Sequence, residues 1–249
     1  MKAIKDEQAT AAAAAAGGDV KRKYVQQMFS DIAPSYDRVN RIISFRIDLW
    51  WRKVALKALD VNRDLGGRYM DLCAGTMDLS SQIQQVPGFH GDVIAADFTE
   101  AMLRAGEEKI SRNNVSPVTA DALALPFRSA SMVAGIVVFG IRNVIDLDGA
   151  LREAYRVLKT GGRFVILEFT KPHNGFVRAV YGFYFNNILP KIGNAVVKHN
   201  TAYNYLPKSV SYFPDTIELA RRMKEVGFQN VQFKTLTFGV VAIHIGEKH

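Results

Sequence analysis

The fold is decided by the stretch Arg68-Tyr69-Met70-Asp71-Leu72-Cys73-Ala74-Gly75-Thr76. A short apolar run that ends in small, turn-forming residues is typical of a buried strand followed directly by a helix. Three similar runs follow along the chain, at residues 92–96, 132–139 and 164–169. This repetition predicts several short strands that are each buried on both faces.

Segments with helical periodicity separate these runs. The clearest is an apolar stripe from Leu147 to Leu158, with Asp146 placed to cap its start. Strands that alternate with helices predict an α/β fold with a parallel sheet covered on both faces.

The C-terminal region predicts a different strand pairing. Asp215 is expected to cap a helix that ends at Gly227. The two runs that follow, at 231–236 and 240–245, are joined by only a few residues. Such a short connection requires a hairpin, so the sheet is expected to end in an antiparallel edge.

Three further segments complete the expected organisation. Residues 1–20 contain an alanine run and are expected to form a disordered tail, followed by one domain over 21–249. Residues 21–60 are expected to form a helical cover, in which Asp48 caps a helix. The aromatic-rich segment 174–213 is expected to be an insertion that covers the open edge of the sheet. Its aromatic side chains suit core packing of a helical lid and binding of an apolar ligand equally well.

Composition excludes several classes of protein. The chain has 249 residues, one cysteine and a net charge of +8. A single cysteine excludes an internal disulfide framework and a multi-cysteine metal site, and we expect no metal. No apolar run approaches the roughly 20 residues that span a bilayer, and we find no signal peptide. The positive charge suits an anionic membrane, a nucleic acid or an acidic substrate.

Four groups of candidate site residues lie at predicted strand ends, where open α/β sheets bind ligands. The turn at Gly75 contains one glycine, so it is neither a Walker A loop nor a full dinucleotide fingerprint. A plain strand-to-helix turn explains it equally well. Asp97 lies 22 residues beyond Gly75, at a distance that suits a carboxylate binding two ribose hydroxyls. The alternative is a structural helix cap.

The other two groups lie further along the chain, one in the loop before Leu125 and the other after the run at 132–139. Asp121 and Ala122 combine a carboxylate with a small residue, which suits an adenine amino group and ring face. Arg142 and Asn143 follow the most apolar run, where polar side chains are costly to bury unless they are paired or used. For Arg142, a salt bridge to a nearby carboxylate is the structural alternative.

Several longer strings make the chain resemble one family. The strings that carry the resemblance are Met28-Phe29-Ser30-Asp31-Ile32-Ala33-Pro34-Ser35-Tyr36-Asp37, Asp71-Leu72-Cys73-Ala74-Gly75-Thr76, Ala124-Leu125-Pro126-Phe127, Phe139-Gly140-Ile141-Arg142-Asn143-Val144, Leu167-Glu168-Phe169-Thr170-Lys171-Pro172 and Tyr203-Asn204-Tyr205-Leu206-Pro207. They resemble the class I S-adenosylmethionine-dependent C-methyltransferases of ubiquinone and menaquinone biosynthesis. The resemblance runs from about Val25 to Gly246.

The resemblance implies a Rossmann-like fold with a mostly parallel seven-stranded sheet, and S-adenosyl-L-methionine as the cofactor. Its implied cofactor-binding residues are Asp71, Gly75, Thr76, Asp97, Phe98, Asp121, Ala122 and Val138. Gly75 and Thr76 would line the amino acid part, Asp97 would hold the ribose, and Asp121 with Ala122 would contact the adenine. The chain departs from the family at Met77, where glycine is usual, and at Val138, where serine is frequent. Either change could lower the affinity for the cofactor.

The resemblance also implies the reaction, which is methylation of a ring carbon in a reduced polyprenyl quinone. The expected conversion is demethylmenaquinol to menaquinol. Arg142 and Asn143 are the first catalytic candidates, because a guanidinium can stabilise a phenolate and an amide can hold a water. Tyr36 and then the weaker candidate Asp37 follow, in the segment that would close over the site.

The substrate and partners remain open to alternatives. We expect the prenyl tail to lie against the N-terminal helices, with Trp50 and Trp51, and the aromatic insertion. Basic residues of the N-terminal region could dock an anionic membrane or form a solvated face: Lys21, Arg22, Lys23, Arg41, Arg46, Arg52 and Lys53. We expect a cytoplasmic enzyme, peripheral at the membrane if these residues dock, and leave a homodimer open. A soluble phenol or amine is a rival substrate, and a non-catalytic binding protein is a rival function. A nucleic-acid substrate is disfavoured, because the chain contains no Pro-Pro string.

Overall fold

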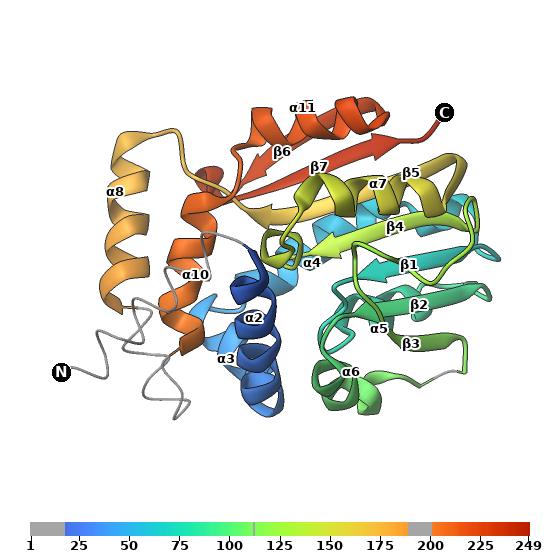
Figure 1. The fold of residues 1–249 in the computed structure, drawn as a ribbon, viewed down its shortest axis with the longest axis horizontal. Helices are drawn as coiled ribbons and strands as arrows, with labels where there is room; N and C mark the ends of the chain where they lie inside the picture. The colour runs from blue at the N-terminus through green and yellow to red at the C-terminus, as the bar shows by residue number, and fades with distance from the viewer. Residues whose placement is uncertain (1–17, 112, 189–200) are drawn as a thin grey trace.

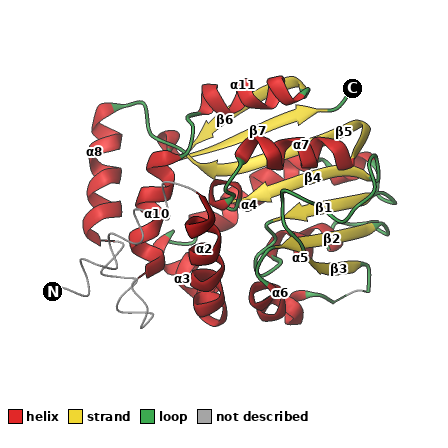
Figure 2. Cartoon of the chain, in the orientation of Figure 1, coloured by secondary structure: helices red, strands yellow, loops and turns green. Residues whose placement is uncertain are grey.

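A computed structural model describes residues 18–111, 113–188 and 201–249 of the chain. Its centre is a seven-stranded sheet with strand order β3-β2-β1-β4-β5-β7-β6 (Figures 1 and 2). The strands are β1 Arg68–Leu72, β2 Asp92–Asp97, β3 Val115–Thr119, β4 Met132–Val138, β5 Leu158–Phe169, β6 Gln229–Leu236 and β7 Val241–Glu247. The architecture confirms the predicted fold class.

Strands β1 to β5 pair in parallel, whereas β7 is antiparallel to β5 and β6 is antiparallel to β7. The expected C-terminal hairpin is therefore confirmed. The strand order reverses beside β1, which pairs with β2 on one side and β4 on the other. Such a reversal opens a crevice at the carboxyl ends of the two strands, where α/β proteins bind ligands.

The edge strand β3 is the one that no apolar run predicted. Its sequence Val-Ser-Pro-Val-Thr is short and largely exposed, so it lacks the continuous hydrophobicity of the central strands. Pro117 is tolerated there because an edge strand can leave one side of its backbone unpaired. The seventh strand was expected from the family resemblance alone.

Helices cover both faces of the sheet (Figure 1). The α-helices are α2 Gly18–Ile32, α3 Tyr36–Ile43, α4 Ile47–Leu59, α5 Asp78–Gln84, α6 Glu100–Gly106, α7 Leu147–Val157, α8 Gly175–Phe183, α10 Thr201–Tyr212 and α11 Thr216–Val226. Short 3₁₀ turns lie at η1 Ala33–Ser35, η2 Val61–Arg63, η3 Glu107–Lys109, η4 Ile141–Asn143 and η6 Thr237–Gly239, and a π-helical turn lies at η5 Tyr184–Ile188.

Alternate residues of the strands enter two separate cores. Tyr69 belongs to the core beneath α4 and α5, whereas its neighbour Met70 belongs to the core beneath α7 and α11. This alternation is the period-two pattern of a sheet covered on both faces. Asp146 and Asp215 cap α7 and α11 as predicted, by accepting backbone N–H groups at the helix starts.

The N-terminal cover differs from expectation in two details. Helix α2 begins at Gly18, so it includes residues 18–20, which were assigned to the tail; residues 1–17 lie outside the described residues. Asp48 was expected to cap α4, but Arg46 occupies the cap position. The Asp48 carboxylate instead pairs with the guanidinium groups of Arg41 and Arg52, because it is buried between them.

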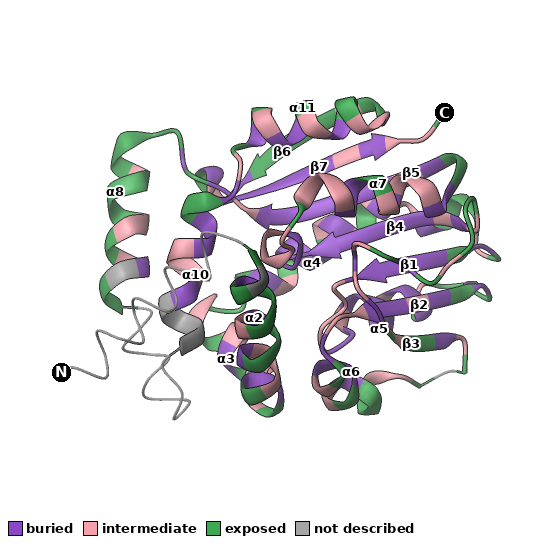
Figure 3. Cartoon of the chain, in the orientation of Figure 1, coloured by how far each residue is buried: buried purple, intermediate pink, exposed green. Residues whose placement is uncertain are grey.

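The aromatic insertion comprises α8, η5 and α10, and its residues 189–200 lie outside the described residues. It lies beyond the carboxyl ends of the strands, not along the edge strands β3 and β6 (Figure 1). This position differs from the expected one because β5 delivers the chain at that end of the sheet, where α10 packs against α2 and η4. Most of α8 faces solvent (Figure 3).

Candidate active site

Two cavities lie at the carboxyl ends of the strands, and they share three aromatic walls. We name them the inner cavity and the outer cavity. The inner cavity, of about 820 Å³ including its part open to solvent, is lined by the ends of β1, β2 and β4 and by α2. The outer cavity, of about 1290 Å³ on the same measure, is lined by the N-terminal cover, the insertion and η6. Phe29, Tyr36 and Phe139 line both.

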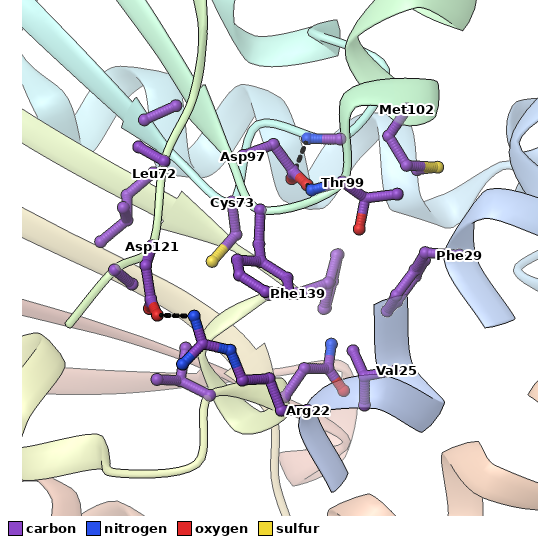
Figure 4. Close-up of a pocket in the computed structure, with 18 of the residues that line it drawn as sticks. Arg22, Val25, Phe29, Leu72, Cys73, Asp97, Thr99, Met102, Asp121 and Phe139 are labelled. Carbon is purple, nitrogen blue, oxygen red and sulfur yellow. Dashed lines mark hydrogen bonds and ion pairs between the residues drawn. The ribbon is translucent and has the colours of Figure 1, made fainter. Parts of the chain in front are cut away.

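Asp97 organises the inner cavity at the end of β2. Its carboxylate accepts the Gly75 N–H at 2.8 Å through Oδ2 and the Thr99 N–H at 2.8 Å through Oδ1 (Figure 4). Burial raises the pKa of Asp97, and the two N–H groups oppose that rise. Asp97 thus holds the turn at Gly75 and the start of α6 while it lines the cavity, so the helix-cap role and the ligand-facing position coexist.

Arg22 from α2 crosses the inner cavity. Its guanidinium forms an ion pair with Asp121 at 2.7 Å and lies over the Phe98 ring at 4.8 Å (Figure 4). Asp121 also accepts the Leu123 N–H at 3.0 Å, and Ala122 is buried beside it. From the sequence, Arg22 was one of the basic residues expected either to dock a membrane or to form a solvated face. The structure shows that this side chain faces a cavity carboxylate instead.

The inner cavity fits S-adenosylmethionine by the chemistry of its lining. Asp97 and Asp121 supply carboxylates, which suit ribose hydroxyls and an adenine amino group. Asn143 adds an Oδ1 that is buried without a hydrogen-bond partner among the described residues, and a bound amine or hydroxyl would satisfy it. Val138, at the end of β4, supplies an apolar wall.

Three sequence-predicted site residues line neither cavity. Asp71 is buried, and its carboxylate accepts the N–H and the hydroxyl of Ser80 at 3.0 and 2.7 Å, which fixes the start of α5. Burial raises the pKa of Asp71 to about 6. Thr76 and Asp37 bond to each other, with the Thr76 hydroxyl 2.7 Å from an Asp37 oxygen. These three residues therefore form hydrogen bonds within the protein and do not line either cavity.

A charged network joins the N-terminal cover to the turn after β1. Lys109 donates to Asp37, to Thr76 at 2.9 Å and to Asp78 at 2.7 Å. Asp78 also accepts from Arg41 at 2.6 Å. Burial alone would raise the pKa of Asp78, but the surrounding cations overcome this effect and lower it to about 2. The sequence missed this role because the partners lie far apart along the chain.

Arg142 lies in the outer cavity as half of a buried ion pair. Its side chain is 8% exposed and that of Glu168 is 2% exposed, and Nη1 lies 2.8 Å from Oε1. The guanidinium also lies 5.5 Å from the centre of the Phe169 ring, and its Nε is 3.3 Å from the Ser209 hydroxyl. The structural alternative proposed for Arg142 is thus present, and the residue also lines the outer cavity.

The rest of the outer cavity is largely aromatic. Trp51 packs edge-on against Phe139 and Phe169, and its indole N–H donates to Thr237 at 2.8 Å. Trp51 therefore lies where an apolar ligand was expected, whereas Trp50 is half exposed on the other side of α4. Tyr36 stands between the two cavities, and burial raises its pKa above the ordinary value.

The departures from the family at Met77 and Val138 do not block the inner cavity, and Val138 forms part of its lining. Met77 has a left-handed backbone with φ of 58°, but its side chain is fully buried in the core and lines neither cavity.

Cys73 lines the inner cavity, where burial raises the pKa of its thiol well above the ordinary value. A thiol that stays protonated is a packing group and not a nucleophile.

The predicted basic cluster divides into residues that bond to other parts of the protein, among which Arg22 is also exposed, and residues that lie on the surface. Lys21 donates hydrogen bonds to the carbonyls of Arg142 and Val144, both at 2.9 Å. These bonds link α2 to η4 and the residue that follows it. Arg22, Arg41 and Arg52 pair with aspartates, as described above. Lys23, Arg46 and Lys53 remain on the surface.

Among the described helices, none is both long enough and apolar enough to cross a membrane. The described residues also contain no cluster of His, Cys, Asp and Glu that could hold a metal ion.

Comparison with known proteins gives the same fold and assigns a family. The model of the ubiE/COQ5 methyltransferase family matches residues 18–248. The chain belongs to the ubiE/COQ5 methyltransferase family. This family member is 40% identical over 232 residues to the ubiquinone/menaquinone biosynthesis C-methyltransferase UbiE of Pasteurella multocida, covering 92% of this chain and 86% of that protein. The UbiE protein of Idiomarina loihiensis is 39% identical, and the match covers 92% of both chains.

Solved structures agree with the fold. An S-adenosylmethionine-dependent methyltransferase from Thermotoga maritima, described as a possible histamine N-methyltransferase, superimposes with a TM-score of 0.63. It is 19% identical to this family member, and the match covers 90% of this chain and 99% of that one. The chain is thus an S-adenosylmethionine-dependent methyltransferase by family, and its substrate must be argued from the outer cavity.

Proposed function

We propose that this methyltransferase transfers a methyl group to a ring carbon of a reduced polyprenyl quinone, with demethylmenaquinol as the substrate. The observation that carries the proposal is the large aromatic cavity that adjoins the inner cavity and is lined by two buried guanidinium groups, those of Arg142 and Arg52. An aromatic cavity suits a quinol ring with its prenyl tail, and a guanidinium suits the oxygen of that ring.

The chain's own residues orient the ring and stabilise charge. S-adenosylmethionine, when bound, supplies a methyl group already activated by its sulfonium. The guanidinium of Arg142 is a cation with N–H donors and no acceptor, so its role is to stabilise a developing phenolate and not to act as a base. Glu168 fixes the guanidinium in place through the 2.8 Å contact. Asn143, whose Oδ1 has no partner among the described residues, is placed to hold a water or a cofactor group in the inner cavity. The aromatic walls exclude bulk water.

The test compares Arg142→Ala with the wild-type chain. We expect turnover of a prenylated quinol to fall much more than the affinity for S-adenosylmethionine, because Arg142 lines the outer cavity and Asp97 lines the inner one. Unchanged turnover, within a factor of two, would show that Arg142 has no catalytic role. Comparing a prenylated with an unprenylated quinol separates this function from methylation of a soluble phenol.

We also propose that the mouth of the outer cavity docks on an anionic membrane that carries the substrate. Phe45 and Ile47 line this cavity and are exposed, at 71% and 40%. Phe238 follows the cavity residue Thr237 in η6 and is 85% exposed. Arg46 lies between Phe45 and Ile47 in the chain and is also on the surface. Exposed apolar residues with adjacent cations are typical of a membrane-surface contact.

Flotation with vesicles tests this docking surface. We expect salt-sensitive binding to vesicles that contain anionic lipid, and weaker binding for Phe45→Ser combined with Phe238→Ser. Ile217→Ser is the matched control, because Ile217 is 66% exposed on α11, away from the cavity mouth. Equal binding by wild type and the double variant would refute the surface. Whether the enzyme is a homodimer is a separate question, which sedimentation answers directly.

A further inference from the structure

Two tyrosine hydroxyls in the outer cavity have no hydrogen-bond partner within the part of the chain that the structure describes. Tyr181 from α8 and Tyr205 from α10 both line this cavity, and the hydroxyl oxygen of each is buried. Neither oxygen has a partner among the described residues. A buried polar group without a partner costs free energy, so proteins rarely retain one without a reason.

Two other tyrosines, the half-buried Tyr184 and the buried Tyr69, have protein partners for their hydroxyls. Tyr184, on the same cavity wall, donates to the carbonyl of Ile43 at 2.6 Å. Tyr69 bonds to two backbone carbonyls. The two unpartnered hydroxyls are therefore a property of the outer cavity and not of buried tyrosines in general.

The electrostatic surroundings keep both hydroxyls protonated. Burial raises the pKa of Tyr205 to about 12 and that of Tyr181 well above its ordinary value. The positive charge of Arg142 acts on both in the opposite direction, which places them in the field of the buried ion pair. At neutral pH each side chain is thus a hydrogen-bond donor near the cation that would stabilise a phenolate.

We propose that Tyr181 and Tyr205 bind the oxygens of the hydroquinone ring and orient it beside Arg142. This inference rests on the proposed function and adds the residues that recognise the ring. Both tyrosines belong to the insertion over residues 174–213. In this proposal the insertion binds the polar ring of the substrate and also covers its apolar tail.

The first experiment replaces each tyrosine by phenylalanine, which removes the hydroxyl and keeps the ring. For Tyr181→Phe and Tyr205→Phe we expect kcat/KM for a prenylated quinol to fall roughly tenfold or more. The affinity for S-adenosylmethionine should not change, and the melting temperature should stay the same or rise, because an unpartnered group has been removed. Tyr184→Phe is the matched control: it should lower the melting temperature, because its hydroxyl has a protein partner.

The second experiment removes from the substrate the ring hydroxyl that a tyrosine is proposed to bind. It uses an analogue of the prenylated quinol that keeps the hydroxyl beside the methylated carbon and lacks the other ring hydroxyl. We expect the wild type to discriminate against this analogue, and at least one of the two phenylalanine variants to lose most of that discrimination.

The outcomes separate the inference from the proposed function. A wild-type chain that methylates no prenylated quinol refutes the function and the inference together. An active wild type with equally active phenylalanine variants refutes the inference alone. Variants that lose activity and stability in parallel, as Tyr184→Phe is expected to do, would assign the hydroxyls a structural role and also overturn the inference.

Discussion

Breaking the buried pair between Arg142 and Glu168 should be among the most damaging single changes in the chain. The two side chains are 8% and 2% exposed, with 2.8 Å between Nη1 and Oε1. Charge centres about 4 Å apart attract by about 4 kcal/mol at an effective dielectric constant of 20. Glu168→Gln removes this attraction and leaves a buried guanidinium uncompensated, which typically costs about 3–5 kcal/mol.

The measurement is urea unfolding followed by tryptophan fluorescence, in a double-mutant cycle. We expect Glu168→Leu and Arg142→Met each to lower the free energy of unfolding by about 3 kcal/mol or more. The double variant should recover most of this loss, because two apolar side chains pack without a buried charge. Its methyl-transfer activity should not recover, since the guanidinium is absent.

An exposed pair is the control for this cycle. Arg104 and Glu100 form an ion pair at 2.6 Å with side chains 71% and 60% exposed, so Arg104→Met should leave the unfolding midpoint unchanged. The reasoning fails if Glu168→Gln is as stable as wild type. It also fails if the double variant is no more stable than the worse single variant, because the two charges would then not be coupled.

Three further predictions concern the turns around the site. Gly140→Ala would place a Cβ 2.3 Å from Cβ of Cys73, so we expect weaker cofactor binding and a lower melting temperature. Gly175→Ala is the control, because its Cβ would meet no atom within 4 Å and should change neither quantity. Asp78→Asn should lower the free energy of unfolding by about 2 kcal/mol at pH 7. Because its folded-state pKa of about 2 lies below the ordinary value, this difference should vanish as the pH falls from 4 to 2 in urea titrations. Met77→Gly should lower the free energy of unfolding by about 2 kcal/mol in the same assay, because the loss of a buried side chain outweighs the relief of a left-handed backbone. Calorimetry should show that the affinity for the cofactor is unchanged.

The sequence predicted the sheet because its central strands are continuous apolar runs between recognisable helix caps. Asp146, Asp215 and Gly227 are local signals, and each has the predicted role in the structure. Asp48 failed as a cap because it lies inside α4, where its carboxylate pairs with Arg52 of the same helix and with Arg41 of α3. The contact with Arg41 depends on how α3 and α4 pack, which no local pattern shows.

The site was predictable at the ends of the central strands, because Asp97 ends β2 and Asn143 lies in the short turn η4 after β4, and both line the inner cavity. Asp121 also lines the inner cavity, although no apolar run predicted the strand β3 before it. Asp37 and Arg22 were assigned less well, because their surroundings depend on how the N-terminal helices dock on the sheet. Asp37 binds Lys109 behind the cavity wall, and Arg22 enters the cavity itself.

The walls of the outer cavity come from a restricted part of the chain. Its lining residues lie at 28–52, 139–142, 169–185, 205–206 and 237–240, so none of them belongs to the described part of 53–138. The inner cavity, by contrast, takes most of its polar lining from strand ends within that stretch. The N-terminal helices contribute to both cavities, whereas the insertion lines the outer cavity and not the inner one. A chimera that exchanges the insertion between relatives should therefore change the acceptor and leave the affinity for the methyl donor unchanged.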